Sequence, residues 1–365
     1  MADAVPELAP AAPTARRAVR LKEVAARAGV SINTVSRAIR APATVRPELR
    51  RHIEAVLDEL DYVPNRLAGG LASAHTGVVG VVVTSLLYSE FAAMIEGLQG
   101  GLARGGLSTM LANSHYRPEE ELRLVRAMLS WRPAAMALIG IDHHPRVSEL
   151  LRHSGIPVVE LWETGDAVID SVVGMDHAGI GRAQASHLLG QGYRRIAFTG
   201  GVRPHDHRAQ RRRDGCVALL EERGCEPLVV TAAEGGTADL GETLLDRLLE
   251  RAPDIDGIVC NSDVIAFGVL RGLTRRGRRV PDEIGVIGFG DNEAASCMQP
   301  PLSTMRPPRA EIGQAAAAAV LARIEGGPAI RRVFTAELIA RSSTARDPAA
   351  AGTGAATSSI REKSS

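Results

Sequence analysis

The fold of the N-terminal part of this chain is decided by the stretch EVAARAGVSINTVSRAI, which spans residues 23–39. Apolar residues recur at helical spacing up to Ala28, and Gly29 then interrupts the helix. Ser31 is a suitable N-cap for a second helix, in which Val35 faces the first helix. Two helices joined by a tight turn that contains Gly are typical of a helix–turn–helix. The stretch therefore predicts that motif.

The outer face of the second helix combines short polar side chains with a cation one turn later. Asn33 is suited to pair with adenine, Arg37 with guanine, and Ile32 to contact a thymine methyl group. A recognition helix presents such side chains to base edges near its N-terminal end. The candidate DNA-contacting residues are Ser31, Ile32, Asn33, Thr34, Ser36 and Arg37. The alternative is a generic helical hairpin whose polar face is only solvated.

Positive charge is concentrated around this motif. Pro47 opens a third predicted helix, which completes an all-helical domain over residues 19–64. Residues 16–51 hold ten Lys or Arg residues and two Glu residues, a net charge of +8. Because the whole chain carries +1, the rest of it carries −7. A basic segment on an acidic body indicates a polyanionic partner for that segment alone.

Composition excludes several other classes of protein. Of the 365 residues, 45% are hydrophobic and only 3% are aromatic, so Ala, Val, Leu and Ile must build the core. No run reaches the roughly 18 apolar residues of a membrane helix, and the N-terminus lacks the order of a secretory signal. We therefore expect a cytoplasmic protein without a membrane partner.

The four cysteines form no CxxC pair and are expected to be reduced thiols: Cys216, Cys225, Cys260 and Cys297. The Ala-rich ends, 1–18 and 346–365, are expected to be a disordered arm and tail.

Beyond Gly77, β-branched runs alternate with helical stretches. This pattern predicts a parallel sheet covered on both faces, and eight candidate strands over this length favour two doubly wound lobes with a ligand cleft between them. The candidate strands are Val78–Val83, Thr109–Asn113, Met136–Ile139, Pro157–Leu161, Arg195–Thr199, Leu228–Thr231, Gly257–Cys260 and Gly285–Phe289.

The helix–turn–helix stretch resembles the N-terminal signature of the lactose-repressor (LacI) family of bacterial transcription regulators. DELDYVPN, at 58–65, resembles the end of that family's DNA-binding domain, and the match continues to about residue 341. The resemblance implies an α/β core of the periplasmic-binding-protein type over 77–345. Its first lobe is expected over about 77–177 and 305–327, and its second over about 178–304 and 328–345.

Between the two domains, the resemblance implies a hinge segment over 65–76, NRLAGGLASAHT, in which Leu71 is the wedge that enters the minor groove. The family often has Ala-Arg-Ser-Leu here, whereas this chain has Gly69-Gly70 before Leu71. Each Gly costs about 1 kcal/mol of helix propensity, so a hinge helix should depend more on DNA. The alternative is a flexible linker that never becomes helical. A second departure is Arg20, where the family often has a Thr cap.

In the core, the resemblance implies an effector pocket between the lobes, with Arg212 as the residue that clamps the effector. The other implied pocket residues are Glu90, Phe91, Trp162, Ser262, Asp263 and Asp291. The role of Asp291 is in doubt because the family's acid directly follows Gly-Phe, and Gly290 stands there in this chain. The cations around Arg212, from Arg203 to Arg213, are expected to be solvated. His205-Asp206-His207 lacks a third ligand at metal-binding spacing, so neither a metal nor a cofactor is expected.

Several stretches, including MLSW at 128–131, HHPR at 143–146 and MQPPL at 298–302, resemble the gluconate-repressor branch. The implied function is a repressor of carbohydrate genes that gluconate, or a related sugar acid, releases from a near-palindromic operator. A neutral sugar, co-repression, or a sugar-binding protein without a regulatory role remain as alternatives.

The motifs GxSxG, HExxH, GxxxxGK[ST] and GxGxxG are absent, so no enzyme activity or catalytic residue is expected. Residues 346–365 lack Leu, so a homodimer without a C-terminal leucine heptad is expected.

Overall fold

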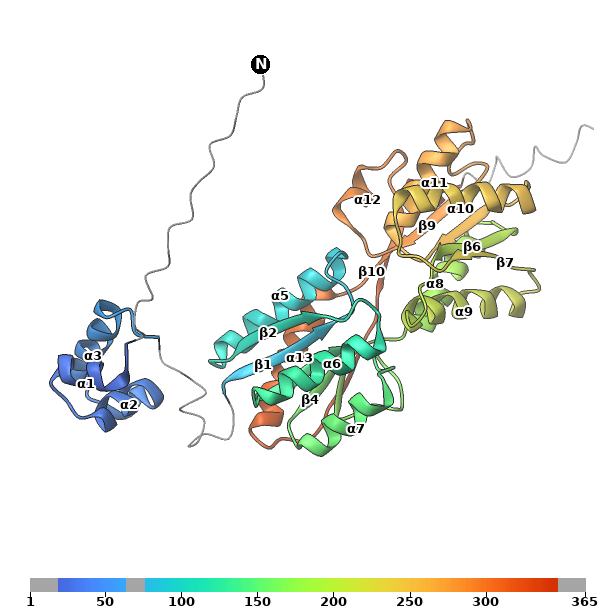
Figure 1. The fold of residues 1–365 in the computed structure, drawn as a ribbon. Helices are drawn as coiled ribbons and strands as arrows, with labels where there is room; N and C mark the ends of the chain where they lie inside the picture. The colour runs from blue at the N-terminus through green and yellow to red at the C-terminus, as the bar shows by residue number, and fades with distance from the viewer. Residues whose placement is uncertain (1–18, 64–75, 347–365) are drawn as a thin grey trace, which may run out of the picture. The chain divides into compact units, whose positions relative to one another are not determined.

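The computed structural model describes residues 19–63 and 76–346 and divides the chain at Gly77 into two compact units (Figure 1). The predicted arm, most of the hinge segment with Leu71, and the tail after Arg346 lie outside the described residues. Arg346 was predicted to begin the tail but belongs to the core. Its guanidinium pairs with Asp256 at 3.1 Å and lies over the Tyr193 ring at 4.9 Å.

The N-terminal unit contains α1 (Leu21–Ala28), α2 (Ile32–Arg40), a 3-10 turn η1 (Pro42–Thr44) and α3 (Pro47–Glu59). Gly29 adopts φ +67°, a left-handed conformation that ends α1 cleanly. Seven residues from the three helices form one small apolar core: Val24, Ala25, Ala28, Val35, Ala38, Ile53 and Val56. This confirms the three predicted helices and the packing of α2 on α1.

The first lobe of the core contains a six-stranded parallel sheet in the order β11-β5-β4-β3-β1-β2. Its strands are β1 (Val78–Val83), β2 (Ser108–Asn113), β3 (Ala135–Ile139), β4 (Val158–Glu163), β5 (Ser171–Met175) and β11 (Arg331–Phe334). Helices α5 (Ser89–Arg104) and α13 (Arg309–Ile324) cover one face, and α6 (Pro118–Ser130) and α7 (Pro145–Ser154) cover the other.

The second lobe repeats this plan with the strand order β12-β10-β9-β8-β6-β7, in which only β12 is antiparallel to its neighbour. Its strands are β6 (Ile196–Gly201), β7 (Leu228–Ala232), β8 (Gly257–Cys260), β9 (Gly285–Phe289), β10 (Ser303–Arg306) and β12 (Glu337–Ile339). Helices α8 (His177–Gly190) and α9 (His207–Glu222) cover one face, and α10 (Ala238–Arg251) and α11 (Asp263–Arg275) the other; α12 (Glu293–Cys297) and η2 (Ser342–Thr344) are short.

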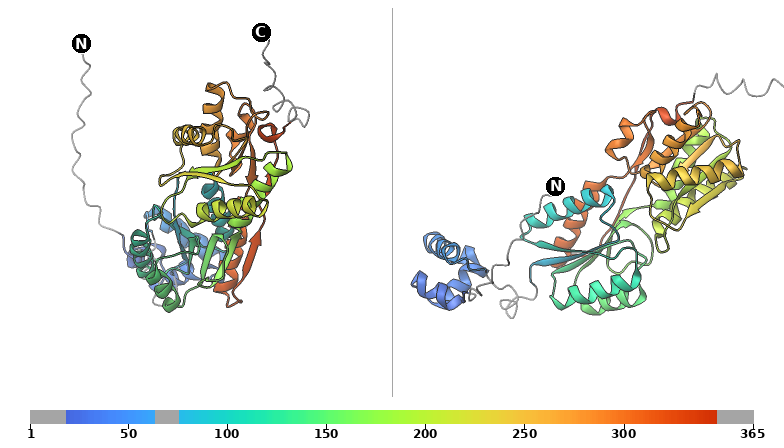
Figure 2. Two further views of the ribbon diagram at one scale, coloured as in Figure 1. Left: turned by 90° about the vertical axis from the view of Figure 1, so that its right-hand side faces the viewer. Right: turned by 45° about the horizontal axis from the view of Figure 1, so that its top comes forward.

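The predicted lobe boundaries near the C-terminus were wrong in part, because β12 lies in the second lobe as predicted but β11 does not. Residues 328–345 were assigned to the second lobe, but β11 pairs in parallel with β5 of the first lobe. The chain therefore crosses between the lobes after β5, after β10 and again between β11 and β12 (Figures 1 and 2). The pattern missed β10, β11 and β12, which have only three or four residues and include polar or charged ones, and β5, in which Gly174 interrupts the apolar run. Among the described residues, no helix is long and apolar enough to cross a membrane.

Candidate functional site

The helical unit presents α2 with its N-terminal end exposed. Ser31 caps that helix, because its Oγ accepts the Thr34 backbone N–H at 3.1 Å. An ion pair of 2.6 Å between Arg27 of α1 and Glu59 of α3 supports the helices behind it. The Thr cap expected at Arg20 is replaced by Glu23, whose carboxylate accepts the Arg20 backbone N–H at 2.9 Å.

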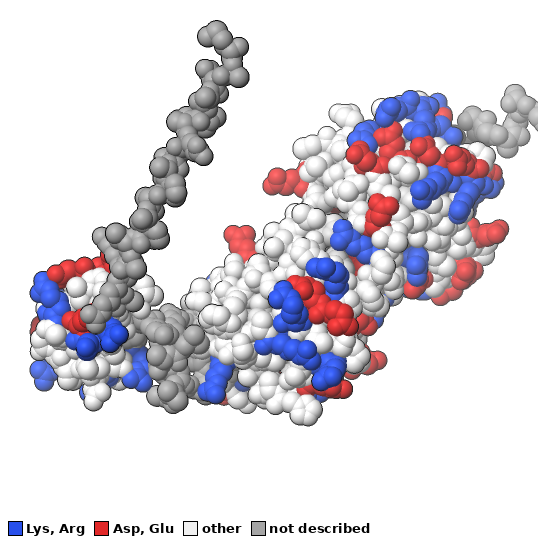
Figure 3. Space-filling model, viewed as in Figure 1, with Lys and Arg blue, Asp and Glu red and all other residues white. Residues whose placement is uncertain are grey.

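The predicted DNA-contacting residues divide into two groups. Ile32, Asn33 and Arg37 are exposed, and Ile32 keeps 49% of its surface accessible although it is a large apolar residue. Ser31, Thr34 and Ser36 have partners within the helix. Ser31 is the cap, Thr34 Oγ1 lies 2.8 Å from Ser31 Oγ, and Ser36 Oγ accepts from Arg40 Nε at 2.9 Å. Figure 3 shows basic side chains on the surface of the helical unit. An exposed apolar side chain between polar and basic neighbours fits a surface that reads base edges.

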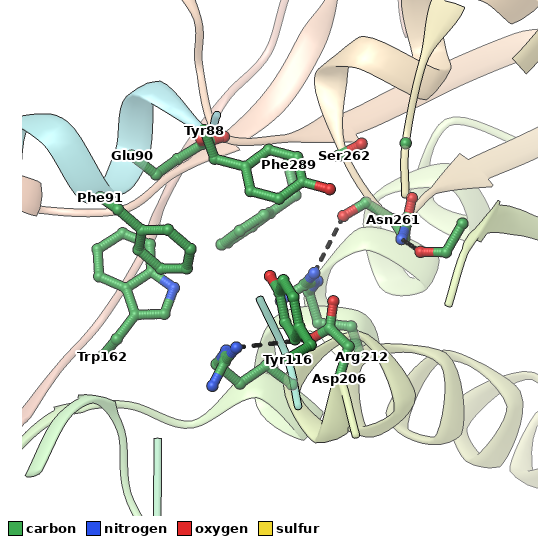
Figure 4. Close-up of a pocket in the computed structure, with 13 residues that line it drawn as sticks. Tyr88, Glu90, Phe91, Tyr116, Trp162, Asp206, Arg212, Asn261, Ser262 and Phe289 are labelled. Carbon is green, nitrogen blue, oxygen red and sulfur yellow. Dashed lines mark hydrogen bonds and ion pairs between the residues drawn. The ribbon is translucent and has the colours of Figure 1, made fainter. Parts of the chain in front are cut away.

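The second candidate site is a pocket between the two lobes of the core, with about 490 Å³ of space when the open solvent at its mouth is included (Figure 4). Side chains of both lobes line it at the carboxyl ends of the strands, where ligands bind in open α/β sheets. The lining residues are Tyr88, Glu90, Phe91, Tyr116, Trp162, Gly201, Asp206, Arg208, Arg212, Gly236, Asn261, Ser262 and Phe289. The chain has only five Phe, four Tyr and two Trp residues, and five of these aromatic residues are in this list.

One wall of the pocket is aromatic. Phe91 packs edge-on against Trp162, with ring centroids 5.6 Å apart, and Tyr88 packs edge-on against Phe91. Trp162 has φ +72° and Tyr116 has φ +58°, conformations that residues with side chains adopt infrequently. Such strain persists only where the surroundings fix it, and it gathers at ligand-binding sites. The wall offers flat apolar faces of the kind that pack against the C–H face of a sugar.

Arg212 is buried and lines the pocket. Its Nη1 donates to Nδ1 of His177 at 2.9 Å, its Nη2 donates to the carbonyl of Asn261 at 3.2 Å, and its Cζ lies 4.2 Å from the centroid of the Phe289 ring. Burial lowers the pKa of Arg212 from its ordinary value. The Nε atom is buried and has no partner among the described residues, so this donor is available to a ligand.

The expectation that the cations around Arg212 are solvated was wrong for Arg208 and Arg211. Arg208 is only 5% exposed, and its Nη2 donates to Thr84 of the first lobe at 3.2 Å. Arg211 bridges the lobes by pairing with Asp142 at 2.6 Å and with Glu163. Both arginines lie on the face of α9 that meets the first lobe, which the sequence alone does not reveal.

Of the other predicted pocket residues, Glu90, Phe91, Trp162 and Ser262 line the pocket, but Asp263 and Asp291 do not. Asp263 is completely buried, and its carboxylate accepts hydrogen bonds from Thr304 Oγ1 at 2.6 Å and the Asn292 backbone at 2.8 Å. Burial raises the pKa of Asp263 to about 6. Asp263 therefore lies outside the pocket lining and holds Thr304 and the Asn292 backbone in place.

Asp291 does not line the pocket because arginines hold it at the junction of the lobes. Arg306 and Arg341 bind its two carboxylate oxygens at 2.6 and 2.8 Å. Gly290, the position where the resemblance places an acid, lies against Glu90 instead, and a side chain at Gly290 would overlap Oε1 of Glu90. Glu90 is buried, and burial raises the pKa of its carboxyl.

Sequence reasoning missed Tyr88, Tyr116, Asp206, Arg208, Asn261 and Phe289 as pocket residues. Asn261 and Phe289 lie at the ends of predicted strands, so the carboxyl-end rule was a usable signal for them. Asp206 caps α9 by accepting the Ala209 N–H at 3.3 Å, and it faces the pocket. Over residues 19–63 and 76–346, no cluster of three or more His, Cys, Asp or Glu residues is arranged to hold a metal ion.

Comparison with known proteins agrees with this two-part architecture. The model of bacterial regulatory proteins of the lacI family matches residues 20–65, and that of the periplasmic binding protein-like domain matches 185–344. The transcriptional regulator GntR of Pseudomonas aeruginosa is 37% identical over 330 residues, covering 89% of this chain and 95% of that protein. GntR of Escherichia coli (strain K12) is 33% identical over 306 residues, covering 84% and 92%.

Solved structures show the same similarity. A LacI family transcriptional regulator from Silicibacter pomeroyi superposes with a TM-score of 0.84 at 33% identity, covering 90% of this chain and 100% of that chain. The transcriptional regulator CelR in complex with cellobiose gives a TM-score of 0.66 at 29% identity, covering 89% and 99%. The chain therefore belongs to the LacI family and is a DNA-binding transcriptional regulator.

Proposed function

We propose that this regulator is a dimeric repressor of sugar-acid utilisation genes, which gluconate or a close analogue releases from a near-palindromic operator. The observation that carries the proposal is the pairing of two buried arginines, Arg208 and Arg212, with an aromatic wall in one pocket. Guanidinium groups bind carboxylates and hydroxyl pairs, and aromatic faces cover the C–H face of a polyol. The resemblance to the gluconate-repressor branch supports the same effector.

The effector would act through the angle between the lobes. Because Glu90 comes from the first lobe and Arg212 from the second, a ligand that touches both binds more tightly to one closure state. Because the chain crosses between the lobes three times, the motion of one lobe would be linked to that of the other. Two recognition helices about 34–36 Å apart would follow this motion through the hinge segment. The coupling is reciprocal, so operator DNA must also weaken effector binding by the same factor.

A neutral sugar is the second candidate effector. The aromatic wall of Phe91 and Trp162 favours it, and a relative, CelR, has been solved in complex with cellobiose. In either case, we infer that the protein acts without catalysis. We also infer that it works in the cytoplasm, where the operator DNA of a bacterial regulator lies.

The decisive experiment selects operator sequences from random duplexes with the full-length protein, at a fixed salt concentration, because phosphate contacts make affinity depend steeply on salt. Binding to the selected duplex is then titrated with gluconate, and with cellobiose and glucose as neutral sugars. A palindrome released by gluconate supports the proposal. Release by a neutral sugar alone would replace the effector, tighter binding with gluconate would reverse the regulatory sign, and absence of any enriched sequence would contradict operator recognition.

A further inference from the structure

The HHPR motif at 143–146 begins in the loop that follows β3, and its first histidine is deeply buried. The side chain of His143 is only 1% exposed and lies between two carboxylates of the first lobe. Its Nδ1 is 2.6 Å from Oε1 of Glu121, on α6, and its Nε2 is 3.4 Å from Oε1 of Glu160, on β4. None of these three residues lines the pocket between the lobes.

These contacts anchor the loop to the first lobe. Burial alone would lower the pKa of His143, but the two carboxylates outweigh burial and raise it to about 9, so the imidazole is charged at neutral pH. The carboxylate of Glu121 also accepts the backbone N–H of His144 at 3.3 Å. Asp142, the residue directly before His143, therefore extends from a backbone that is held in place.

The side chain of Asp142 crosses the cleft to Arg211 on α9 of the second lobe. Nη1 of Arg211 donates to Oδ2 of Asp142 at 2.6 Å, and Nη2 donates to Oδ1 at 3.2 Å, which makes the pair bidentate. Burial opposes ionisation of Asp142, but Arg211 outweighs it and lowers the pKa of that carboxyl, so both partners are charged at neutral pH. Nη1 of Arg211 also binds Glu163 of the first lobe. Two carboxylates of one lobe thus hold one guanidinium of the other.

The strength of this contact depends on how far water is excluded. The side chains of Asp142 and Arg211 are each 35% exposed, and that of Glu163 is 1% exposed. Fully exposed ion pairs contribute little, whereas bidentate pairs that are partly shielded from water contribute more. Arg208 also reaches the first lobe, but its hydrogen-bond partner there, the Thr84 hydroxyl, is neutral. The contacts of Arg211 therefore favour the conformation in which the lobes are together.

We propose that Asp142 and Arg211 form a latch that holds the two lobes closed, and that His143 is the positioning residue that keeps Asp142 within reach of Arg211. Neither partner of the latch lines the pocket between the lobes, so the latch acts on effector affinity only through the closed population. A ligand that touches both lobes binds the closed state, and its apparent affinity falls with the fraction of protein that is closed. This consequence for the effector rests on the proposed function, whereas the latch itself does not.

Trp162 can report closure without any effector. It lines the pocket between the lobes and is only 2% exposed, so separation of the lobes would uncover it. The chain has one other tryptophan, Trp131, and the full-length Trp131→Phe protein therefore serves as the parent for every variant. The measurement is the quenching of Trp162 fluorescence by acrylamide.

The latch variants are Asp142→Asn and Arg211→Gln, which alter opposite lobes. The control is Arg213→Gln on the same helix, because Arg213 pairs with its neighbour Asp214. Loss of the latch should shift the closure equilibrium about fivefold, so both latch variants should show a higher quenching constant than the parent and the control. Unchanged quenching in both would overturn the latch, and a change in only one would show a local effect on that lobe.

His143→Gln tests the positioning role. It should raise the quenching constant as Asp142→Asn does, and the double variant should be quenched no more than Asp142→Asn alone, because His143 acts through Asp142. Additive effects would show that His143 does not act through the latch. If thermal melting shows that His143→Gln is unfolded, Glu121→Gln weakens the same anchor and is combined with Asp142→Asn in the same way.

Titration with potassium gluconate separates the latch from the proposed function. If the parent binds gluconate, both latch variants should bind it more weakly, by up to about fivefold, although no pocket residue has changed. Equal affinity in spite of greater quenching would show that the effector does not select the closed state. If the parent does not bind gluconate, the proposed effector is wrong, and the quenching measurement alone decides whether the latch exists.

Discussion

Arg212 donates a hydrogen bond of 2.9 Å from Nη1 to Nδ1 of His177, and this contact fixes the chemistry of both side chains. A guanidinium can only donate, so Nδ1 accepts and the proton of the imidazole is on Nε2, which donates to the carbonyl of Trp162 at 3.0 Å. Burial, followed by the charge of Arg212, holds the pKa of His177 well below its ordinary range. The pocket arginine of the second lobe is thereby linked to the pocket tryptophan of the first.

Replacement of Arg212 by Ala should weaken the effector response. The substitution removes the free Nε donor from the pocket and leaves His177 and the Asn261 carbonyl without their partner. Hydrogen bonds to charged groups contribute about 1.5–3 kcal/mol, so effector affinity should fall by roughly tenfold or more. Effector-dependent release of labelled operator measures this, with Arg213→Ala as the control on the same helix. An unchanged response would place the effector elsewhere.

Replacement of Arg37 by Ala should relax base preference in the operator. Arg37 is exposed on α2, one turn from Ile32 and Asn33. A bidentate contact to guanine discriminates by about 1–3 kcal/mol, and its loss should affect one base position in each half-site. Binding to all single-base operator variants measures the change. Uniform weakening at every position, with a reduced salt dependence, would instead make Arg37 a phosphate contact.

Replacement of Asp263 by Asn should alter how stability depends on pH. The folded-state pKa of Asp263, about 6, exceeds the ordinary value of 3.8, so the folded protein binds this proton more tightly than the unfolded chain does. The contribution of Asp263 to stability therefore falls as pH rises from about 4 to above 6. Asn can accept the Asn292 N–H with its Oδ1 and donate from its Nδ2 to the Thr304 hydroxyl, so both contacts can be kept without a charge. Relative to wild type, the free energy of unfolding of the variant should therefore rise by about 3 kcal/mol over this window.

Urea unfolding at pH 4.5, 6 and 7.5 measures that difference. The exposed Asp166, replaced by Asn, serves as the control for removal of a surface carboxylate. A constant difference between wild type and Asp263→Asn across the three pH values would show that Asp263 ionises in the folded state as it does in the unfolded chain.

Replacement of Gly290 by Ala should disturb Glu90. A Cβ at this position would overlap the Glu90 carboxylate, and Gly290 has φ +132°, which disfavours a side chain. We expect a lower melting temperature and weaker effector binding. Adding Glu90→Ala should recover part of the lost stability because it removes the overlap, although the backbone strain stays. Strictly additive effects in the double-mutant cycle would mean that the two residues do not interact.

The oligomeric state is a further prediction. The C-terminal residues 346–365 contain no leucine for a heptad repeat, so the protein should sediment as a dimer at micromolar concentration. Sedimentation equilibrium over a hundredfold concentration range measures the mass, in the presence and absence of operator. A tetramer would show that another surface joins two dimers.

Local patterns in the sequence were sufficient where the responsible interactions are themselves local. Gly29, Ser31 and Pro47 set the ends of the first three helices through backbone conformation and capping, which act within a few residues. The β-branched run of Val78–Val83 became β1 with the predicted bounds. The family resemblance also identified Arg212, which the structure places in the cleft.

Only the tertiary structure decided which charged residues belong to the cleft. Arg208 and Arg213 look alike in the sequence, yet one is buried against Thr84 and the other pairs with Asp214. The assignment of β11 to the first lobe also depends on a strand, β5, more than 150 residues away. Burial and counterions arise when distant segments meet, and the free energy of a buried charge is set by all the groups around it. That is why the sequence alone determined the recognition helix and the alternating strands, whereas packing between the lobes determined the chemistry of the pocket.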